Sequence, residues 1–238
     1  MIKKIFYLIV TACCMTACQN DDTDFSAYTN GTITATHVIN ITYKDNSVEV
    51  TGDEQGYVST VGADVTVNAT AKNDSLLLVL SGTTTDGSLL VFRDSKYGIK
   101  LNGVSITNAD GPAINNQCGK SLYLEVANGT TNTLTDGMTY AEQTYDQKGA
   151  LFSEGQIYFL GTGTLNVTGN SKHAIACDDY IIMNENTTIN VTCTSGNGIK
   201  VNDGIWINNG HKMNCLQDKM NYLLNKVVIK IEDRKSVV

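Results

Sequence analysis

The chain has 238 residues, with 17 Lys and Arg against 24 Asp and Glu and a formal net charge of −7. This excess of acid argues against binding the phosphate backbone of nucleic acids, which requires a dense basic face. Only 17% of the residues are charged and 42% are hydrophobic, so a highly charged disordered chain is excluded and a core can form. With 21 Gly, 1 Pro and many Thr and Asn, the composition favours strands joined by tight turns over a helical enzyme.

The first residues have the pattern of a bacterial lipoprotein signal. Lys3 and Lys4 precede an apolar run, Ile5–Val10, that is too short to span a bilayer. The tetrapeptide that ends at Cys18 resembles a lipobox, in which the cysteine carries lipid; a similar one that ends at Cys13 would leave an unusually short leader. Cys18 is therefore the expected lipidation site.

These signals predict a signal peptide at 1–17 and a tether at 18–30. The polar, acidic residues 19–22 resemble the export signal of surface lipoproteins of Bacteroidetes, although an ordinary solvated tether has the same composition. We expect an outer membrane lipoprotein, exposed at the cell surface and attached to the membrane through its lipid alone.

Four cysteines remain once the leader is removed and Cys18 carries lipid: Cys118, Cys177, Cys193 and Cys215. No two of them form a C-x-x-C pair, so zinc and redox motifs are not supported. We expect these thiols to be buried as small hydrophobic groups.

A repeat of 24 residues organises the middle of the chain. Gly149, His173 and Asn197 begin equivalent segments, and the strand-like run at 164–168 recurs at 188–192. Short alternating strands without intervening helices predict an all-β fold, a right-handed parallel β-helix whose coils stack on one another. A β-sandwich also has short strands, but its hairpins would not keep a turn motif at a fixed offset.

The predicted β-helix domain covers residues 31–210. An earlier copy of the repeat, Gly111–Ile114, is separated from the next by an inserted loop at roughly 128–147. The remaining segment, 211–238, has no Gly and holds 6 of the 17 basic residues, with apolar side chains at helical spacing. This segment is expected to be either a helix that caps the coils or the aberrant end of a truncated or frame-shifted chain.

Stacked coils bring acidic and amide side chains together. Side chains one coil apart lie about 4.8 Å from each other, and two carboxylates at that distance repel by roughly 3 kcal/mol at an effective dielectric near 20. Calcium binds several carboxylate and amide oxygens in loose geometry, so a calcium site is expected at the residues that the 24-residue offset aligns: Asp178, Asp179, Asn202, Asp203 and Glu154. Tight turns alone also require Asp and Asn.

Basic and aromatic residues form a second candidate set. Lys148 and Lys172 are 24 residues apart, and Lys200 lies in the next unit. Aligned ammonium groups predict contact with carboxylated sugars, although lysines are also common on solvated faces. The inserted loop carries Tyr140 and Tyr145, whose rings can face a sugar or lie flat on the coils. These five residues are the candidate carbohydrate contacts.

Several motifs together resemble the bacterial carbohydrate-binding domain-containing protein family, which comprises secreted and lipid-anchored β-helix proteins. The resemblance covers about 97–208 and is carried by Asn102–Val104, Asp110–Asn115, Gly129–Gly137, Lys148–Ser153 and Lys172–Ile175. It implies a right-handed parallel β-helix of the pectate-lyase-like superfamily, calcium held among the coils, and binding to plant-type or acidic polysaccharides. Asn197 stands where family members usually have Asp, which weakens a calcium site there, and family members are typically longer.

We expect a monomeric surface lipoprotein that binds polysaccharide without catalysis. One alternative is a calcium-dependent, pectate-type polysaccharide lyase, in which Lys200 or Lys172 removes a proton as the base. Another is an adhesin or structural spacer. His173 is expected to form a hydrogen bond in a turn, and no G-x-S-x-G, P-loop or H-E-x-x-H motif is present.

Overall fold

The computed structural model describes residues 35–70, 74–183, 186–208, 212–216 and 230–232. All regular elements in these ranges are β-strands, so the predicted all-β fold is confirmed. Over the same ranges, no helix has the length and apolarity needed to cross a membrane. The predicted signal peptide at 1–17, Cys18 and the tether at 18–30 lie outside the described residues.

The strands form two sheets. The smaller has seven strands, in the order β17-β14-β11-β8-β6-β4-β3. Its strands are β3 (Val58–Val61), β4 (Asp64–Ala69), β6 (Ser88–Arg93), β8 (Ile114–Asn116), β11 (Gly149–Ser153), β14 (His173–Cys177) and β17 (Ile199–Val201).

The larger sheet has thirteen strands, and its main path runs β19-β16-β13-β10-β7-β9-β12-β15-β18-β20. The strands of this path are β7 (Tyr97–Thr107), β9 (Leu122–Val126), β10 (Thr131–Thr135), β12 (Ile157–Gly161), β13 (Thr164–Gly169), β15 (Tyr180–Met183), β16 (Thr188–Cys193), β18 (Gly204–Asn208), β19 (Lys212–Leu216) and β20 (Lys230–Glu232). Off this path lie β1 (His37–Lys44), β2 (Val48–Thr51) and β5 (Leu76–Thr84).

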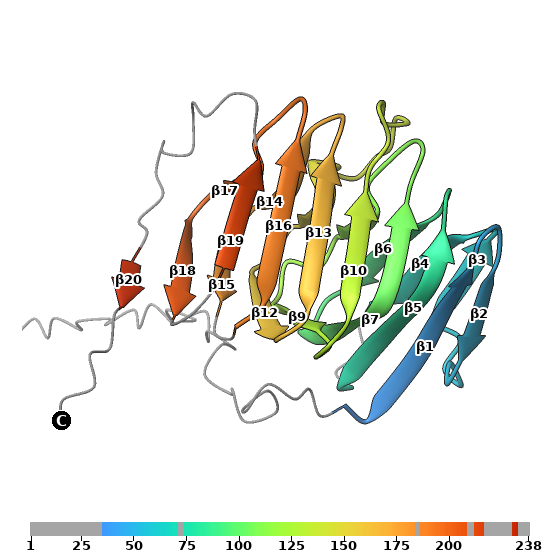
Figure 1. The fold of residues 1–238 in the computed structure, drawn as a ribbon. Coiled ribbons are helices and arrows are strands. Elements are labelled where there is room, and N and C mark those ends of the chain that lie inside the picture. The colour runs from blue at the N-terminus through green and yellow to red at the C-terminus, as the bar shows by residue number, and fades with distance from the viewer. Residues whose placement is uncertain (1–34, 71–73, 184–185, 209–211, 217–229, 233–238) are drawn as a thin grey trace, which may run out of the picture.

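Successive strands recur in threes, and equivalent strands pair in parallel (Figure 1). In three neighbouring pairs of strands the partners are Gly149 with His173, Ile157 with Ile181, and Thr164 with Thr188. Residues 24 positions apart are therefore hydrogen-bonded neighbours, as the side-chain contact of Asn166 with Asn190 also shows. The predicted 24-residue register is confirmed.

The long strand β7 joins the two arms of the larger sheet. Its first half pairs with β9 and its second half with β10. At the bend between the halves, the buried side chain of Asn132 accepts hydrogen bonds from the backbone N–H groups of Gly103 and Val104, at 2.8 and 3.0 Å. These bonds satisfy amide groups that the bend removes from the strand ladder.

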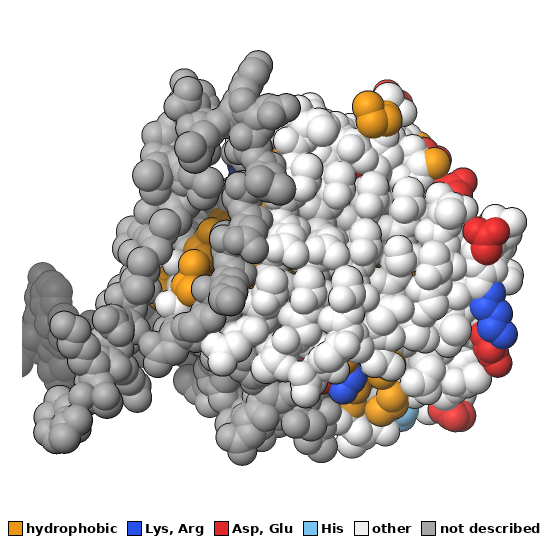
Figure 2. Space-filling model, in the orientation of Figure 1, with side chains coloured by type: hydrophobic (Ala, Val, Ile, Leu, Met, Phe, Trp, Pro, Cys, Tyr) orange, Lys and Arg blue, Asp and Glu red, His pale blue; other side chains and the backbone are white. Residues whose placement is uncertain are grey.

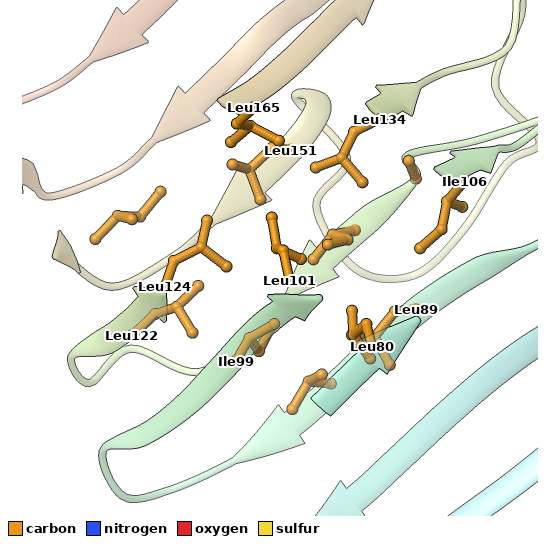
Figure 3. Close-up of a cluster of buried hydrophobic side chains, with 14 of the residues drawn as sticks. Leu80, Leu89, Ile99, Leu101, Ile106, Leu122, Leu124, Leu134, Leu151 and Leu165 are labelled. Carbon is orange, nitrogen blue, oxygen red and sulfur yellow. The ribbon is translucent and has the colours of Figure 1, made fainter. Parts of the chain in front are cut away.

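The core follows from alternation along the strands. In β13, for example, Leu165 and Val167 are buried, whereas the residues on either side of them are partly exposed. Successive side chains of a strand point to opposite faces, so every coil directs its Leu, Ile and Val side chains to one continuous interior (Figure 3). Cys118, Cys177 and Cys193 are free and buried, as expected, while the side chain of Cys215 lies outside the described residues.

The inserted loop is shorter than predicted. Residues 131–135 form the regular strand β10, and Thr131–Thr135 pairs residue by residue with Thr164–Thr168. The 24-residue offset does not predict this strand, because the insertion between β10 and β13 makes the sequence distance between their paired residues longer than 24. The true insertion, residues 136–148, lies between β10 and β11, and we call it the inserted segment.

A capping helix was one of the two expectations for 211–238, and it is wrong for the two parts of this segment that the structure describes, which are strands. Lys212–Leu216 is the strand β19, paired with β16, and Lys230–Glu232 is the strand β20, paired with β18. In β19 the 24-residue register continues from Thr188 to Lys212, so pairing with the preceding coil overrides the helical spacing. The rest of this segment lies outside the described residues.

Candidate functional site

The inserted segment is fixed at its start by a buried carboxylate. Asp136 is 2% exposed and accepts hydrogen bonds from the Tyr140 hydroxyl at 2.6 Å and from the Asn170 backbone N–H at 2.5 Å. Burial raises the pKa of Asp136 above its usual value, although these donors favour the charged form. The Tyr140 ring is thereby held against the body of the protein, not free in solvent.

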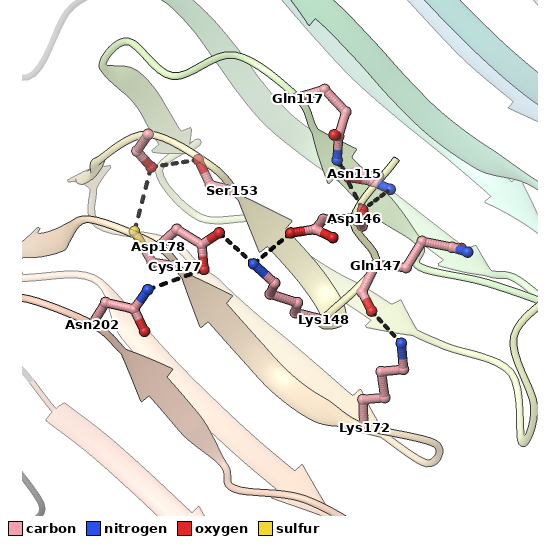
Figure 4. Close-up of polar contacts among 11 residues, drawn as sticks. Asn115, Gln117, Asp146, Gln147, Lys148, Ser153, Lys172, Cys177, Asp178 and Asn202 are labelled. Carbon is pink, nitrogen blue, oxygen red and sulfur yellow. Dashed lines mark hydrogen bonds and ion pairs between the residues drawn. The ribbon is translucent and has the colours of Figure 1, made fainter. Parts of the chain in front are cut away.

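The end of the inserted segment is tied to the outer face of the seven-stranded sheet. The carbonyl oxygen of Asp146 accepts hydrogen bonds from the side-chain amides of Asn115 and Gln117, at 3.1 and 2.9 Å (Figure 4). Between its two anchored ends the segment crosses β6 and β8, where the edge of the Phe92 ring and the Tyr145 ring meet at 5.8 Å between centroids. The segment therefore covers part of the sheet and leaves a cleft beside it.

This cleft has a volume of about 230 Å³. It lies between the inserted segment and the strands β4, β6 and β8, and its lining residues are Asp64, Thr66, Ser88, Leu89, Leu90, Asn108, Asp110, Gly111, Pro112, Asn115, Gln143, Tyr145 and Gln147. One aromatic ring, side-chain amides, hydroxyls and carboxylates thus converge on one hollow. The lining is mostly polar, with one aromatic ring and a few apolar side chains among carboxylates, amides and hydroxyls, so it suits a ligand rich in hydroxyl groups.

The cleft is acidic. Burial raises the pKa of Tyr145, and the carboxylates of Asp110 and Asp64 raise it further. The Ser88 hydroxyl donates to Asp64 at 2.7 Å, while the lining of this cleft includes no Lys or Arg. The groups present can accept hydrogen bonds from hydroxyls and donate through amides, but they repel an anionic ligand.

The Lys148 ammonium is paired with carboxylates of the protein itself. This ammonium group lies 2.6 Å from the carboxylate of Asp146 and 2.5 Å from that of Asp178 (Figure 4). The same ammonium lies 5.2 Å from the centroid of the Phe152 ring. Burial alone would lower the pKa of Lys148, but the two carboxylates outweigh it and raise the pKa. This lysine is an internal counter-charge.

The five residues expected to hold calcium stack as their spacing predicts. The Asn202 side-chain amide donates to Asp178 at 3.3 Å, and the Asp203 backbone N–H donates to the Asp179 carbonyl at 3.1 Å. On the preceding coil, burial raises the pKa of Glu154, and the neighbouring Asp146 and Asp178 carboxylates raise it further. The structure thus brings the acidic residues of three coils together.

These residues do not fit a calcium cage. Asp178 already contacts the Lys148 ammonium on one oxygen and the Asn202 amide on the other. Within the described ranges, no three His, Cys, Asp or Glu side chains converge as metal ligands would. The repulsion that led us to expect calcium is offset here by a lysine of the chain, and calcium binding stays a prediction.

Lys172 and Lys200 differ in their surroundings. The Lys172 ammonium donates to the Gln147 carbonyl at 2.5 Å and lies 5.0 Å from the centroid of the Tyr140 ring. Lys200 is exposed on β17, where it pairs with Ala176. The residue stacked on Lys172 in the next coil is Gly196, so the three lysines do not form one column.

His173 has the role that was expected of it. Its Nδ1 accepts a hydrogen bond from the Asn197 backbone N–H at 2.9 Å. Burial lowers the pKa of His173, and the charge of Lys200 lowers it further. The ring therefore joins two coil corners as a neutral acceptor.

The structure also shows aromatic residues that the sequence reasoning missed. On the outer face of the larger sheet, Tyr123 and Tyr158 stack at 4.9 Å, and Tyr180 meets Trp206 edge to face at 4.9 Å. Applying the 24-residue offset to outward positions would have aligned Trp206 with Ile182 of the preceding coil. The lining of the cleft could not be found in this way, because the inserted segment does not follow the register.

Comparison with known proteins agrees with this architecture. The family model described as carbohydrate-binding domain-containing protein matches residues 61–218. A protein of that description from Acetivibrio thermocellus is 32% identical over 104 residues, which are 42% of this chain and 36% of the relative. The match thus spans little more than a third of that relative's length.

A solved structure has a similar fold. The polysaccharide lyase-like protein from C. thermocellum, studied as a gadolinium derivative, superposes with a TM-score of 0.58 at 18% identity. The superposition covers 82% of this chain and 94% of that one, and at this identity the likeness shows a shared fold. Because the family model matches more than half of the sequence, the chain belongs to the carbohydrate-binding domain-containing protein family.

Proposed function

We propose that this chain binds polysaccharide without catalysis, and that a segment of a neutral glycan occupies the cleft beside the inserted segment. The observation that carries the proposal is the cleft itself, in which Tyr145 is surrounded by amides, hydroxyls and carboxylates. A sugar offers hydroxyl groups for these polar partners and an apolar ring face for the tyrosine. Membership of the family and the polysaccharide lyase-like description of the structural neighbour are consistent with this ligand class.

The acidic lining favours a neutral glycan over a uronate. Asp64 and Asp110 both line the cleft, and Lys148, the basic residue of the inserted segment, is bound to two carboxylates. An anionic sugar would lose its solvation beside two negative charges without gaining a counter-ion. The acidic glycans expected from the sequence therefore fit this cleft less well than neutral plant-type glycans.

Several wider features belong to the same proposal. The parallel pairing of strands in threes supports a right-handed parallel β-helix. The N-terminal pattern supports a lipoprotein at the outer membrane, anchored at Cys18 and exposed at the cell surface, with the domain acting as a monomer. The Lys172 ammonium lies close to the cleft, where it donates to the carbonyl of the lining residue Gln147, whereas Lys200 is not among the lining residues. A lyase that uses either lysine as its base stays an alternative to this proposal.

Calorimetric titration of the purified protein with neutral oligosaccharides tests the proposal. The Tyr145→Ala variant should bind about tenfold more weakly, because truncating an interface tyrosine typically costs more than 1 kcal/mol. Tyr180→Ala, a matched change on the outer face of the other sheet, should leave the affinity unchanged. Wild-type protein that binds no glycan would support a spacer instead, and equal affinities of Tyr145→Ala and wild type would place the ligand elsewhere.

A further inference from the structure

A second surface of the molecule has an unusual regularity. The outward side chains of β13 and β16 are all Thr or Asn and lie in register, namely Thr164, Asn166 and Thr168 opposite Thr188, Asn190 and Thr192. Their inward neighbours, such as Leu165 and Val191, are buried in the core. The alternation therefore directs every polar residue of these strands to one outer face.

The same pattern continues on the preceding coil. Thr131, Thr133 and Thr135 are the outward residues of β10 and pair in parallel with the outward residues of β13. We call the outer face of β10, β13 and β16 the threonine face. Neighbouring strands lie about 4.8 Å apart, and alternate residues of a strand about 6.7 Å apart, so the hydroxyl and amide groups form an even two-dimensional array.

The threonine face carries no charge. Figure 2, which has the orientation of Figure 1, shows over β10 and β13 an expanse that is neither acidic, basic nor hydrophobic. Strand propensity explains part of the Thr content, yet protein surfaces generally place charged residues at about a quarter or more of their positions. All nine outward positions of the three strands lack them.

The side chains of this face are also held in place. Asn190 donates from its amide to Asn166 at 2.8 Å, and each Thr has a branched Cβ that restricts its first side-chain torsion. Ordering these side chains against a ligand costs less entropy than ordering Lys or Arg. The side chains of the face therefore have little torsional freedom to lose when a ligand binds.

We infer that the threonine face adsorbs to the surface of an ordered, insoluble, neutral polysaccharide, an inference that rests on the proposed function. An ordered glycan surface presents a repeated array of uncharged hydroxyl groups, and an uncharged array of hydroxyls and amides is complementary to it. A single soluble chain fits the face less well, because none of its nine outward side chains is aromatic. The cleft would hold one chain end or side branch, while the face contacts the bulk material.

Retention on insoluble glycan particles tests this inference. Purified full-length protein is incubated with particles of a neutral β-glucan, and the bound fraction is measured at low and high salt. Thr168→Lys places a long charged side chain on the central strand of the face, at the end of its row of outward residues, and Thr168→Val removes one hydroxyl while keeping the shape. Thr60→Lys, an exposed position on β3, is the matched control, and thermal melting confirms that each variant is folded.

We expect Thr168→Lys to lower retention about tenfold, Thr168→Val to lower it less, and Thr60→Lys to leave it unchanged. Retention of the wild type should be insensitive to salt, because no charges are paired. The affinity for soluble oligosaccharides should be unchanged in Thr168→Lys and about tenfold weaker in Tyr145→Ala.

Two outcomes overturn the inference and leave the proposed function intact. One is equal retention of Thr168→Lys and wild type; the other is a wild type that binds soluble oligosaccharides but no particles. In the second outcome, binding of the wild type to ice crystals would identify another ordered array of hydrogen-bonding groups as the ligand of the face. A wild type that binds no glycan in either form contradicts the proposed function itself.

Discussion

Arg93 is a fully buried guanidinium at the end of β6, and Asp74 provides its counter-charge. Its Nη2 lies 3.1 Å from the Asp74 carboxylate, and its Nε donates to the Ser95 carbonyl at 3.1 Å. Burial alone would raise the pKa of Asp74, but the hydrogen bond and charge of Arg93 outweigh it, so the pKa is lowered. A buried charge whose partner is removed is strongly destabilising, which makes this pair a sensitive point of the fold.

The first prediction concerns this pair. Asp74→Asn should lower the free energy of unfolding by about 3 kcal/mol at neutral pH, because the Arg93 charge loses its counter-ion. A lowered pKa in the folded state means that Asp74 stabilises the protein at neutral pH and that this contribution is lost as the pH falls through the lowered pKa. Urea unfolding curves should therefore differ at pH 7 and converge at strongly acidic pH.

A matched control is available in the exposed ion pair of Lys44 with Glu49, at 2.6 Å. Glu49→Gln should change the unfolding midpoint little at any pH, because exposed ion pairs contribute little. A difference between Asp74→Asn and wild type that does not shrink on acidification would contradict the account of the pair.

At the scale of elements, the coil corners decide which strands can stack. Gly161 ends β12 with a φ of +81°, a left-handed conformation that side chains with a Cβ rarely adopt. A Cβ at this position would also collide with the carbonyl oxygen of Val126 in the preceding coil. The turn between β12 and β13 thus depends on glycine both for its backbone conformation and for the close approach of two coils.

We therefore predict that Gly161→Ala destabilises the protein by roughly 1–3 kcal/mol. For a domain of this size, each kcal/mol lowers the melting temperature by about 2–4 °C. Gly119→Ala is the control, since a Cβ there meets no atom within 4 Å, and its melting temperature should match that of wild type. Equal melting temperatures for the two variants would show that this corner is not tightly packed.

The register of the elements could be predicted from the sequence because it is periodic. The runs at 164–168 and 188–192 share length, alternation and composition, so their pairing follows from the repeat alone. β10 was missed because the inserted segment precedes the next copy and changes the spacing. The strand β19 was not predicted, because the helical spacing that begins at Leu216 and the absence of Gly favoured a capping helix or an aberrant end for 211–238, whereas Lys212–Leu216 pairs with β16.

The candidate site was less predictable than the fold. The repeat placed Lys148 and Asp178 on neighbouring coils, but it could not show that the ammonium turns toward the carboxylate and away from solvent. The cleft depends on how the inserted segment folds back over β6 and β8, and contacts such as Asn115 with Asp146 obey no period. Local repetition determines the register, whereas non-repeated side chains determine the site.

At the scale of the whole molecule, acidity and glycan binding are compatible. The chain has a net charge of −7, and two of its candidate ligand lysines, Lys148 and Lys172, are engaged within the protein. We propose ligand contact at an acidic cleft on one sheet and at the uncharged threonine face on the other. Under this proposal the ligand at both surfaces is a neutral glycan, while calcium binding stays a prediction.

The most direct test of this account is affinity electrophoresis of the wild-type protein in gels that contain either a neutral β-glucan or polygalacturonate, each with calcium or with a chelator. We predict that the neutral glucan slows migration equally in both conditions and that polygalacturonate has little effect. Retardation by polygalacturonate alone, and only with calcium present, would contradict the account and restore the calcium-dependent recognition of acidic glycans expected from the sequence.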